Sequence, residues 1–205
     1  MVTIANPLAK RRRREETRQR LLEAALGVFA RNGYERATVD EIVRAAGFSK
    51  GAFYVHFESK DDLFWGILQE RIARQQAAFR QALDPARPVG ENLARILTNV
   101  FALSRNDPLW TAMFMEFVAH GARNEKVRDE LSQMYTNWRN FAVETLRAGR
   151  ELSLIREDID VDFAATTIIA LIEGMMMQSR FGGDSAQLDA AIEPLSQLLG
   201  GWLAA

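Results

Sequence analysis

The chain has 205 residues, of which 48% are hydrophobic, 26% are charged and none is cysteine. This length and composition fit a globular protein of one domain, or of a small domain joined to a larger one, and they exclude disulfides and thiolate chemistry. We expect no membrane span, because no apolar run free of charges reaches about 18 residues. The N-terminal basic cluster precedes Glu15 and Glu16 rather than an apolar segment, so a secretory signal is not indicated and a cytoplasmic location is expected.

Charge is unevenly distributed along the chain. Residues 1–60 hold 12 Lys and Arg against 7 Asp and Glu, a balance of +5. Residues 61–205 hold 14 against 20, a balance of −6, and the two balances sum to the net charge of −1. A basic head on an acidic body suggests that the head binds a polyanion. A basic tail that only aids solubility would give the same balance.

Apolar spacing and capping signals predict the first two helices. The first, ending at Gly33, is indicated by apolar residues three and four positions apart: Leu22, Ala25, Leu26 and Phe29. Thr38, with Glu41 three residues later, forms a capping-box pattern in which each side chain satisfies a free backbone amide. A short second helix is therefore predicted over 39–46, and Gly47 ends it.

Helices are predicted for the rest of the chain as well. Ser49 is a good cap for a third short helix to about residue 55, and Ser59 for a fourth to about residue 83. After a loop over 84–90, five more helices are predicted, at about 91–104, 108–120, 124–150, 161–181 and 185–203. No alternating pattern bounded by turns indicates a strand, so the predicted fold class is all-α.

The second and third helices, joined by a tight turn at Gly47, predict a helix-turn-helix, whose second helix enters the major groove of DNA. A helix of about seven residues is only about 10 Å long, which suits a groove better than a core. Lys50 can reach a guanine edge or a phosphate. Small residues around it let the backbone approach DNA closely: Ser49, Gly51 and Ala52.

Polar and aromatic side chains alternate after the third helix begins. Tyr54 and His56 offer polar tips to phosphate oxygens, and Lys60 adds charge at a capped helix start, where backbone amides bind anions. Phe53 and Phe57 are expected to face inward. The alternatives are structural: a half-buried core tyrosine, a satisfied histidine and a solvated lysine.

The block ATVDEIVRAAGFSKGAFYVHFESKDDLF, Ala37 to Phe64, and the preceding FARNGYERAT give a more specific signal than any single residue. The run from about Leu21 to Leu68 resembles the DNA-binding domain of the TetR family of bacterial transcriptional regulators. The resemblance implies a helical head joined by the fourth helix to a helical body that binds a ligand and dimerises. We accordingly expect an arm over 1–14, a DNA-binding domain over 15–60, and an effector-binding and dimerisation domain over 61–205.

The resemblance also implies roles for single residues. Positions that match Thr38, Tyr54, His56 and Lys60 touch phosphates in the family. Others lie at or near bases, namely those that match Ser49, Lys50, Gly51, Ala52 and Val55. Val55 stands where many relatives carry an aromatic or polar residue, so the pattern departs from the family there.

Five successive basic residues, Lys10 to Arg14, precede the first apolar repeat. Such like charges repel, and we expect them to stay extended unless a partner neutralises them. Arms of this kind follow phosphates or enter a narrow minor groove, and a solvated tail is the alternative. The candidate DNA-binding residues of the arm are Arg11, Arg12, Arg13 and Arg14.

Two clusters in the body are candidate functional sites. Flat and flexible side chains are expected to line an apolar effector cavity, with ordinary core packing as the alternative: Trp110, Met113, Phe114, Phe117 and Trp138. Small and sulfur-containing residues near the C-terminus suit a close helix contact between subunits, or else a core within one subunit: Gly174, Met177 and Phe181. The family's dimer, a four-helix bundle built from the last two helices of each subunit, is what the resemblance implies here.

An enzyme is not indicated. The chain has two histidines, His56 and His120, no Gly-rich phosphate loop and no nucleophile elbow. No catalytic residue, metal or cofactor is expected. We predict instead a homodimeric repressor, whose two recognition helices lie about 34–36 Å apart on a palindromic operator. A small, largely apolar effector would shift it to a spacing that no longer fits. The alternative is an architectural DNA-binding protein without a ligand, whose body would be fully packed rather than hollow.

Overall fold

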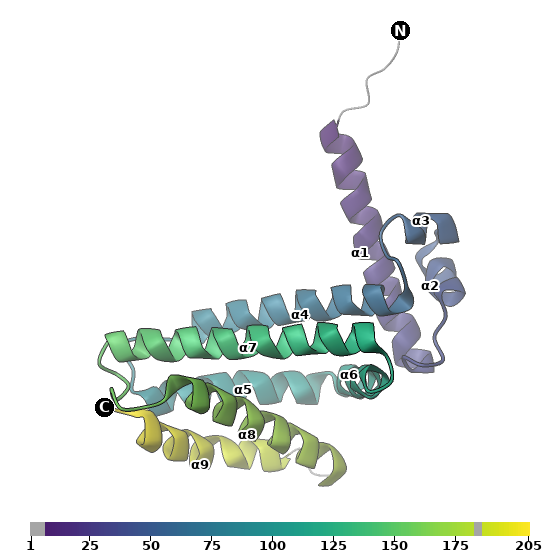
Figure 1. Ribbon diagram of the computed structural model, residues 1–205. Helices are drawn as coiled ribbons and strands as arrows, with labels where there is room; N and C mark the ends of the chain where they lie inside the picture. Colours follow the sequence, from purple (N-terminus) through teal and green to yellow (C-terminus); the bar gives the residue numbers. More distant parts are fainter. Residues whose placement is uncertain (1–6, 183–185) are drawn as a thin grey trace. The chain divides into compact units, whose positions relative to one another are not determined.

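The structure is a computed structural model that describes residues 7–182 and 186–205, without the side chains of residues 7, 9, 103, 104, 108, 180–182, 186 and 187 (Figure 1). Within these residues the chain forms nine α-helices and no strand, and an isolated bridge joins Ile155 to Ala204. The predicted all-α fold is therefore confirmed. The helices are α1 (Pro7–Asn32), α2 (Val39–Ala46), α3 (Lys50–Tyr54), α4 (Lys60–Ala82), α5 (Val89–Asn106), α6 (Pro108–Gly121), α7 (Glu125–Glu151), α8 (Val161–Gly182) and α9 (Ala186–Leu203).

The basic run at the N-terminus is the exception to the predicted helix boundaries. We expected Lys10 to Arg14 to be extended, but α1 begins at Pro7 and includes all five residues. Arg and Lys have high helix propensity, and this outweighs repulsion between charges that water screens. Arg12 also pairs with Glu16 one turn later, at 2.9 Å between Nε and Oε1. The prediction of an extended arm is therefore wrong.

Contacts divide the chain into two compact units, and each is described here by itself. The first comprises the described residues up to Ile72 together with Leu109–Arg128, and the second comprises Ala73–Pro108 and Asp129–Ala205. α6 thus belongs to the same unit as α1 to α3. The units are cut differently from the domains expected over 1–14, 15–60 and 61–205, which describe functions and stay predictions.

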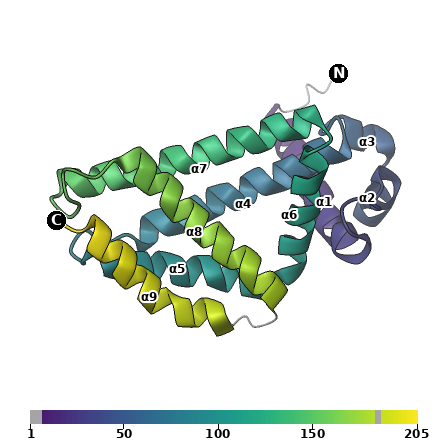
Figure 2. The ribbon, with the colours of Figure 1, turned by 60° about the horizontal axis from the view of Figure 1, so that its bottom comes forward.

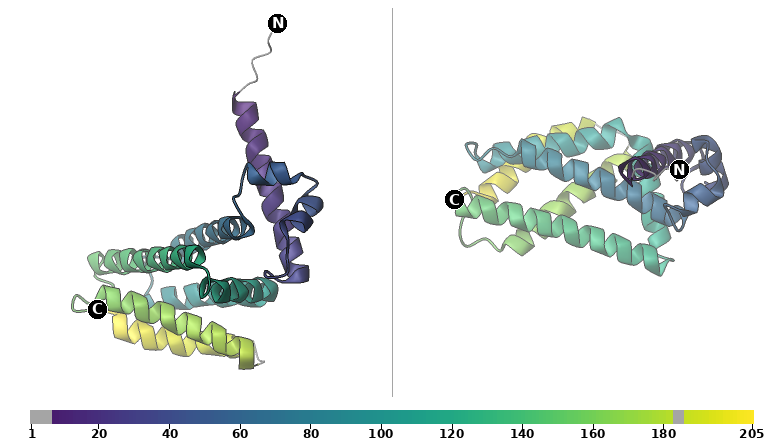
Figure 3. Two further views of the ribbon diagram at one scale, coloured as in Figure 1. Left: turned by 45° about the vertical axis from the view of Figure 1, so that its right-hand side comes forward. Right: turned by 90° about the horizontal axis from the view of Figure 1, so that it is seen from above.

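The first unit holds the helix-turn-helix. In Figure 3, α2 and α3 lie beside α1. The Thr38 side chain accepts from the Glu41 backbone N–H, and the Glu41 carboxylate accepts from the Thr38 N–H, which confirms the predicted capping box. Gly47 ends α2 with φ of 72°, a left-handed conformation that costs other residues energy, and this turn separates α2 from α3.

Aromatic side chains fill the core of the first unit. Tyr34 and Phe64 are at most 1% exposed, and their ring centroids lie 5.0 Å apart in an edge-on arrangement. Phe117 of α6 lies 4.4 Å from the Phe64 ring and 5.4 Å from the Tyr34 ring. Phe29 of α1 lies 5.6 Å from both the Tyr34 and the Phe64 rings, so α1, α4, α6 and the turn after α1 share one core.

The second unit packs around α5 and α9, which lie side by side, with α8 in contact with both (Figure 2). Their ends approach so closely that a Cβ atom built on Gly200 would lie 2.8 Å from the Gly90 Cα atom. The close contact between α5 and α9 at this point thus depends on the absence of a side chain. One core cluster of this unit includes Leu93, Leu146 and Leu203, and another includes Phe79 and Phe101.

One stretch of the second unit is unusually apolar. Within the described residues, Val161–Ser179 is long and apolar enough to cross a membrane by length and composition alone, although we expected no such span. The core helix of a soluble protein passes the same test, so one such stretch is weak evidence for a membrane span. In the isolated chain 17% of the stretch is fully buried, and its exposed large apolar side chains are Phe163 and Met177.

Candidate DNA-binding site

The candidate recognition helix α3 presents one face outward and buries the other. Ser49 caps it, accepting a hydrogen bond from the Ala52 backbone N–H at 3.2 Å, as expected of a serine at this position. Phe53 and Phe57 are 0% and 4% exposed, which confirms that they face inward. Tyr54 is 57% exposed, so its hydroxyl is accessible to a large ligand rather than enclosed in the core.

Lys50 begins α3 and pairs with an acidic residue that we did not single out from the sequence. Its Nζ atom lies 2.9 Å from Oδ1 of Asp40, in the first turn of α2. This hydrogen bond raises the pKa of Lys50, so the ammonium stays charged. Gly51 and Ala52 follow on the same short helix, and a Cβ atom at Gly51 would meet Ser49 Oγ at an ordinary 3.7 Å.

A second basic group of the site comes from α1. The Arg14 guanidinium donates to the backbone oxygen of Val55, which directly follows α3, at 3.3 Å. His56 is half-buried beside it, and burial first, then the charges of Arg14 and Arg18, lower the pKa of His56. Arg11, Arg12 and Arg13 are exposed on the preceding turns of α1. The structure thus brings Arg14 to the end of the candidate recognition helix. Among the described residues, it brings none of the other three arginines into contact with a candidate DNA-binding residue.

Lys60, which we expected to contact a phosphate, makes hydrogen bonds within the protein in this structure. Its Nζ donates to the backbone oxygens of Tyr34 at 2.7 Å and Glu35 at 3.1 Å, and it lies 4.4 Å from the centroid of the Tyr34 ring. Burial lowers the pKa of this lysine. Lys60 therefore fastens the start of α4 to the turn after α1, and its phosphate contact stays a prediction.

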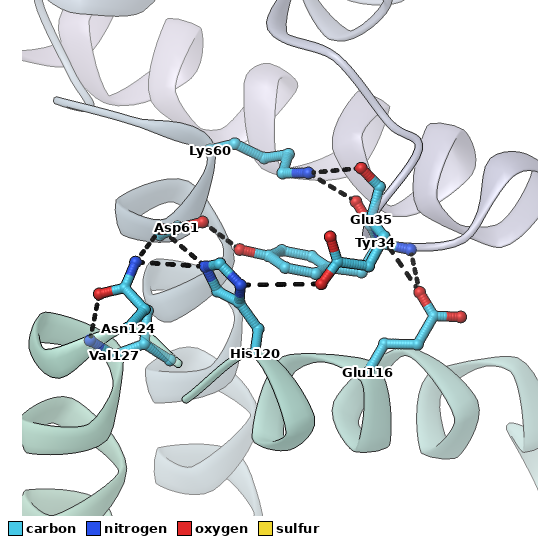
Figure 4. Close-up of polar contacts among 8 residues, drawn as sticks. All are labelled: Tyr34, Glu35, Lys60, Asp61, Glu116, His120, Asn124 and Val127. Carbon is cyan, nitrogen blue, oxygen red and sulfur yellow. Dashed lines mark hydrogen bonds and ion pairs between the residues drawn. The ribbon is translucent and has the colours of Figure 1, made fainter. Parts of the chain in front are cut away.

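A polar network joins α6 to that same turn (Figure 4). Oε2 of Glu116 accepts from the backbone N–H groups of Tyr34 at 2.6 Å and Glu35 at 3.3 Å. The Tyr34 hydroxyl donates to Asp61 Oδ1. His120 lies between two carboxylates, with Nε2 3.4 Å from Asp61 Oδ2 and Nδ1 3.7 Å from Glu35 Oε1. No signal in the sequence pairs residues this far apart.

The five residues expected to line an effector cavity are divided between the two units. In the first, Trp110 stacks on Phe64 with centroids 5.5 Å apart, Phe114 lies 6.4 Å from Trp110, and Met113 and Phe117 are buried. In the second, Trp138 packs against Phe79 with centroids 5.8 Å apart. Core packing thus accounts for the surroundings of all five, and their contact with an effector stays a prediction.

A cavity of about 300 Å³ lies in the second unit, at the C-terminal parts of α4 and α7. Its walls include Arg80, Leu83, Phe141, Thr145, Ala148 and Leu154. None of the five predicted residues lines it. The Arg80 guanidinium lies 4.8 Å from the centroid of the Phe141 ring, and Asp84 and Glu144 also line the cavity, so its mostly apolar wall carries one cation and two carboxylates.

The residues expected at a subunit contact lie on α8. A Cβ atom added to Gly174 would meet nothing within 4 Å, and Met177 is 47% exposed. Met175 and Met176, by contrast, pack against a core cluster of the second unit. The side chain of Phe181 lies outside the described residues. α8 therefore presents a small residue and an apolar one on a face that the subunit itself leaves open.

A capped, half-exposed short helix after a glycine turn, set on a buried aromatic core and flanked by basic groups, defines a helix-turn-helix DNA-binding protein. Comparison with known families agrees. Residues 21–65 match the model described as bacterial regulatory proteins, tetR family, and residues 88–204 match the BetI-type transcriptional repressor, C-terminal. The chain belongs to the TetR family of transcriptional regulators.

Known relatives span nearly the whole chain. The chain is 30% identical over 190 residues to the transcriptional repressor DhaR of Mycobacterium sp., and the match covers 91% of this chain and 90% of DhaR. The transcriptional repressor AcnR of Corynebacterium diphtheriae is 28% identical over 178 residues, and the match covers 86% of this chain and 87% of AcnR. The structure of Salmonella enterica GusR is 27% identical and superposes with a TM-score of 0.74, covering 98% of both chains.

Proposed function

We propose that this DNA-binding transcriptional regulator is a homodimeric repressor that leaves a palindromic operator when a small, largely apolar effector binds its C-terminal domain. The observation that carries the proposal is the helix α3, whose exposed face bears Lys50 and Tyr54 while its opposite face is anchored by buried Phe53. Repressors among the relatives and the BetI-type repressor match support repression rather than activation. Because its proposed operator is bacterial DNA, we propose that the protein acts in the cytoplasm.

Binding is divided between phosphates and bases. Thr38, Tyr54, His56 and Arg14 contact phosphates and position the head, because phosphate contacts carry no direct sequence information. Lys50 reads a base edge, helped by small neighbours that let α3 enter the groove: Ser49, Gly51 and Ala52. Arg11, Arg12 and Arg13 extend the basic surface along α1.

Dimerisation brings two recognition helices to one operator. The face of α8 that bears Gly174 and the exposed Met177 packs against the same face of a second copy, and Phe181 is proposed to take part in this contact. Close contact at Gly174 is favoured by the free space around it. One short helix in each subunit reads few bases, so tight binding requires both subunits.

Effector binding would take place in the second unit. The partly open pocket beside Phe141 is the candidate effector site, and the match to a BetI-type transcriptional repressor favours a regulator over an architectural protein. Its mostly apolar walls suit an apolar ligand, and the charged lining residues Arg80, Asp84 and Glu144 suit a polar group on it. None of the five aromatic and methionine residues predicted from the sequence lines this cavity. We keep their contact with an effector as a separate proposal: Trp110, Met113, Phe114, Phe117 and Trp138.

Genome-wide mapping of the DNA bound in the source bacterium tests the proposed function. A repressor should occupy a few sharp sites next to promoters, each with an inverted repeat. Deletion of the gene should raise transcription from the neighbouring promoters. Broad occupancy without preferred sites would contradict the proposal and favour the architectural protein, and lower transcription after deletion would indicate an activator.

A further inference from the structure

Asp40 and Lys50 face each other across the turn of the helix-turn-helix. Asp40 is the second residue of α2 and Lys50 the first residue of α3, and Nζ lies 2.9 Å from Oδ1. Both side chains are about half exposed, at 57% and 55%. The carboxylate therefore sits on the surface that carries the candidate base-reading lysine, where a negative charge opposes DNA binding.

We propose that Asp40 is a specificity-determining residue, which holds the Lys50 ammonium as an oriented hydrogen-bond donor for a base and weakens its attraction to phosphates. The proposal rests on the proposed function, because it assumes that α3 enters the major groove. It goes beyond that function by assigning the discrimination between operator and random DNA to a residue that need not touch DNA.

Orientation is the first part of the effect. A lysine ammonium has three N–H donors on a flexible four-carbon stem, and a free one points in many directions. One donor is held by Asp40, which leaves two to meet acceptors on a base edge, such as guanine O6 and N7. Asp40 thus acts as a positioning residue for Lys50.

Charge is the second part. A phosphate is attracted to the full charge of a lysine, and the adjacent carboxylate cancels most of that attraction while repelling the phosphate itself. The acceptors of a base carry no net charge, so hydrogen bonds to them lose much less. The pair therefore penalises the non-specific contact more than the specific one, which is how a repulsive element increases specificity.

The test compares Asp40→Asn with the parent protein in the full-length chain, by fluorescence anisotropy over a series of salt concentrations. The two probes are a duplex selected from a random-sequence pool by the parent protein and a scrambled duplex of equal length. We expect the ratio of the two affinities to fall by about 2- to 5-fold, the range of an exposed ion pair. Freed Lys50 should also make the salt dependence on scrambled DNA steeper by about 0.9 in log K against log salt, one additional phosphate contact.

Two controls separate positioning from charge. Glu23→Gln removes the same charge from the exposed surface of α1, and it should leave the affinity ratio unchanged. In a Lys50→Ala background, Asp40→Asn should leave the ratio unchanged, because no ammonium remains to be positioned and the lost repulsion acts equally on both duplexes. Equal gains on both duplexes, or a ratio that still falls without Lys50, would overturn the role of Asp40. Failure of the parent protein to select any sequence would instead contradict the proposed function.

Discussion

Glu116 and Tyr34 are 82 positions apart, yet the Glu116 carboxylate accepts the Tyr34 backbone N–H at 2.6 Å. The same oxygen accepts the Glu35 N–H, so one side chain of α6 satisfies two amides of the turn that ends α1. Gly33 makes room for it, because a Cβ atom there would lie 3.1 Å from both carboxylate oxygens and φ is 76°. α6 is thereby fixed to the turn that leads into the helix-turn-helix.

Glu116→Ala should destabilise the protein by about 1.5–3 kcal/mol, the contribution of hydrogen bonds to a charged group, because partly buried amides lose their acceptor. Glu116→Gln keeps a neutral acceptor and should lose less than the alanine variant. Urea unfolding followed by circular dichroism measures both, with Glu23→Ala as a surface control expected within about 0.5 kcal/mol of the parent. An alanine variant as stable as the control would show that the turn does not depend on this carboxylate.

The contact between α5 and α9 is tested by two adjacent glycines. Gly200→Ala places a methyl group against the Gly90 backbone and should cost about 1–3 kcal/mol of unfolding free energy, as overpacking does. Gly201 has nothing within 4 Å of an added Cβ atom, so Gly201→Ala should be neutral or stabilise by up to about 1 kcal/mol. Urea titrations at one fixed protein concentration compare them. Equal effects of the two substitutions would rule out the close backbone contact.

Gly174→Arg should separate the subunits without unfolding them. A Cβ atom at this position meets nothing within 4 Å in the isolated subunit, but the arginine would place a charge inside the proposed contact between α8 helices. Sedimentation velocity should then give a monomer with unchanged helicity, and operator affinity should be lost. Gln69→Arg, which adds the same charge at an exposed position of α4, should remain a dimer. A dimeric Gly174→Arg protein would move the interface elsewhere.

His56 predicts a pH dependence of DNA binding. The pKa of His56 is lowered from 6.5, so in the free protein the ring is neutral at pH 7. It gains a proton only at a pH below that at which an ordinary histidine does. A phosphate contact favours the protonated ring, so binding takes up a proton and affinity should rise by roughly fivefold as pH falls from about 7.5 to about 5.5, the strength of one exposed ion pair. The sign is opposite for folding. The unfolded chain protonates more readily, so the share of stability linked to His56 declines as pH falls below 6.5.

His56→Gln should flatten that rise in affinity, and it leaves His120, the second histidine, in place. Anisotropy on the selected duplex between those two pH values measures both proteins. If parent and variant rise by the same factor, the titrating group lies elsewhere and His56 has only a structural part.

The features that the sequence predicted well are local ones. Thr38 with Glu41, Gly47 and Ser49 act within three or four residues, so their spacing alone indicates the ends of α2 and α3. Repulsion between like charges predicts that Arg11 to Arg14 are extended, whereas the structure makes them helical. Helix propensity outweighs this repulsion, because water screens the exposed charges and Glu16 pairs with Arg12.

Long-range arrangements could not be predicted from such patterns. Aromatic residues at helical spacing indicate a buried face, but not which core it joins, so Phe117 was assigned to a cavity although it packs on Tyr34 and Phe64. The sequence pattern does not predict the partner of Lys50 for a similar reason. Asp40 lies on another helix, and only the geometry of the turn brings the two together.

Selection of bound sequences from a random pool of DNA duplexes tests the central claim most directly. The full-length protein should enrich an inverted repeat whose half-site centres lie about 34–36 Å apart, or about 10–10.5 base pairs, because two α3 helices related by twofold symmetry would enter successive major grooves. Lys50→Ala should relax the preference at one position in each half-site. A pool that shows no enriched sequence, or a single half-site without its inverted copy, would contradict the account.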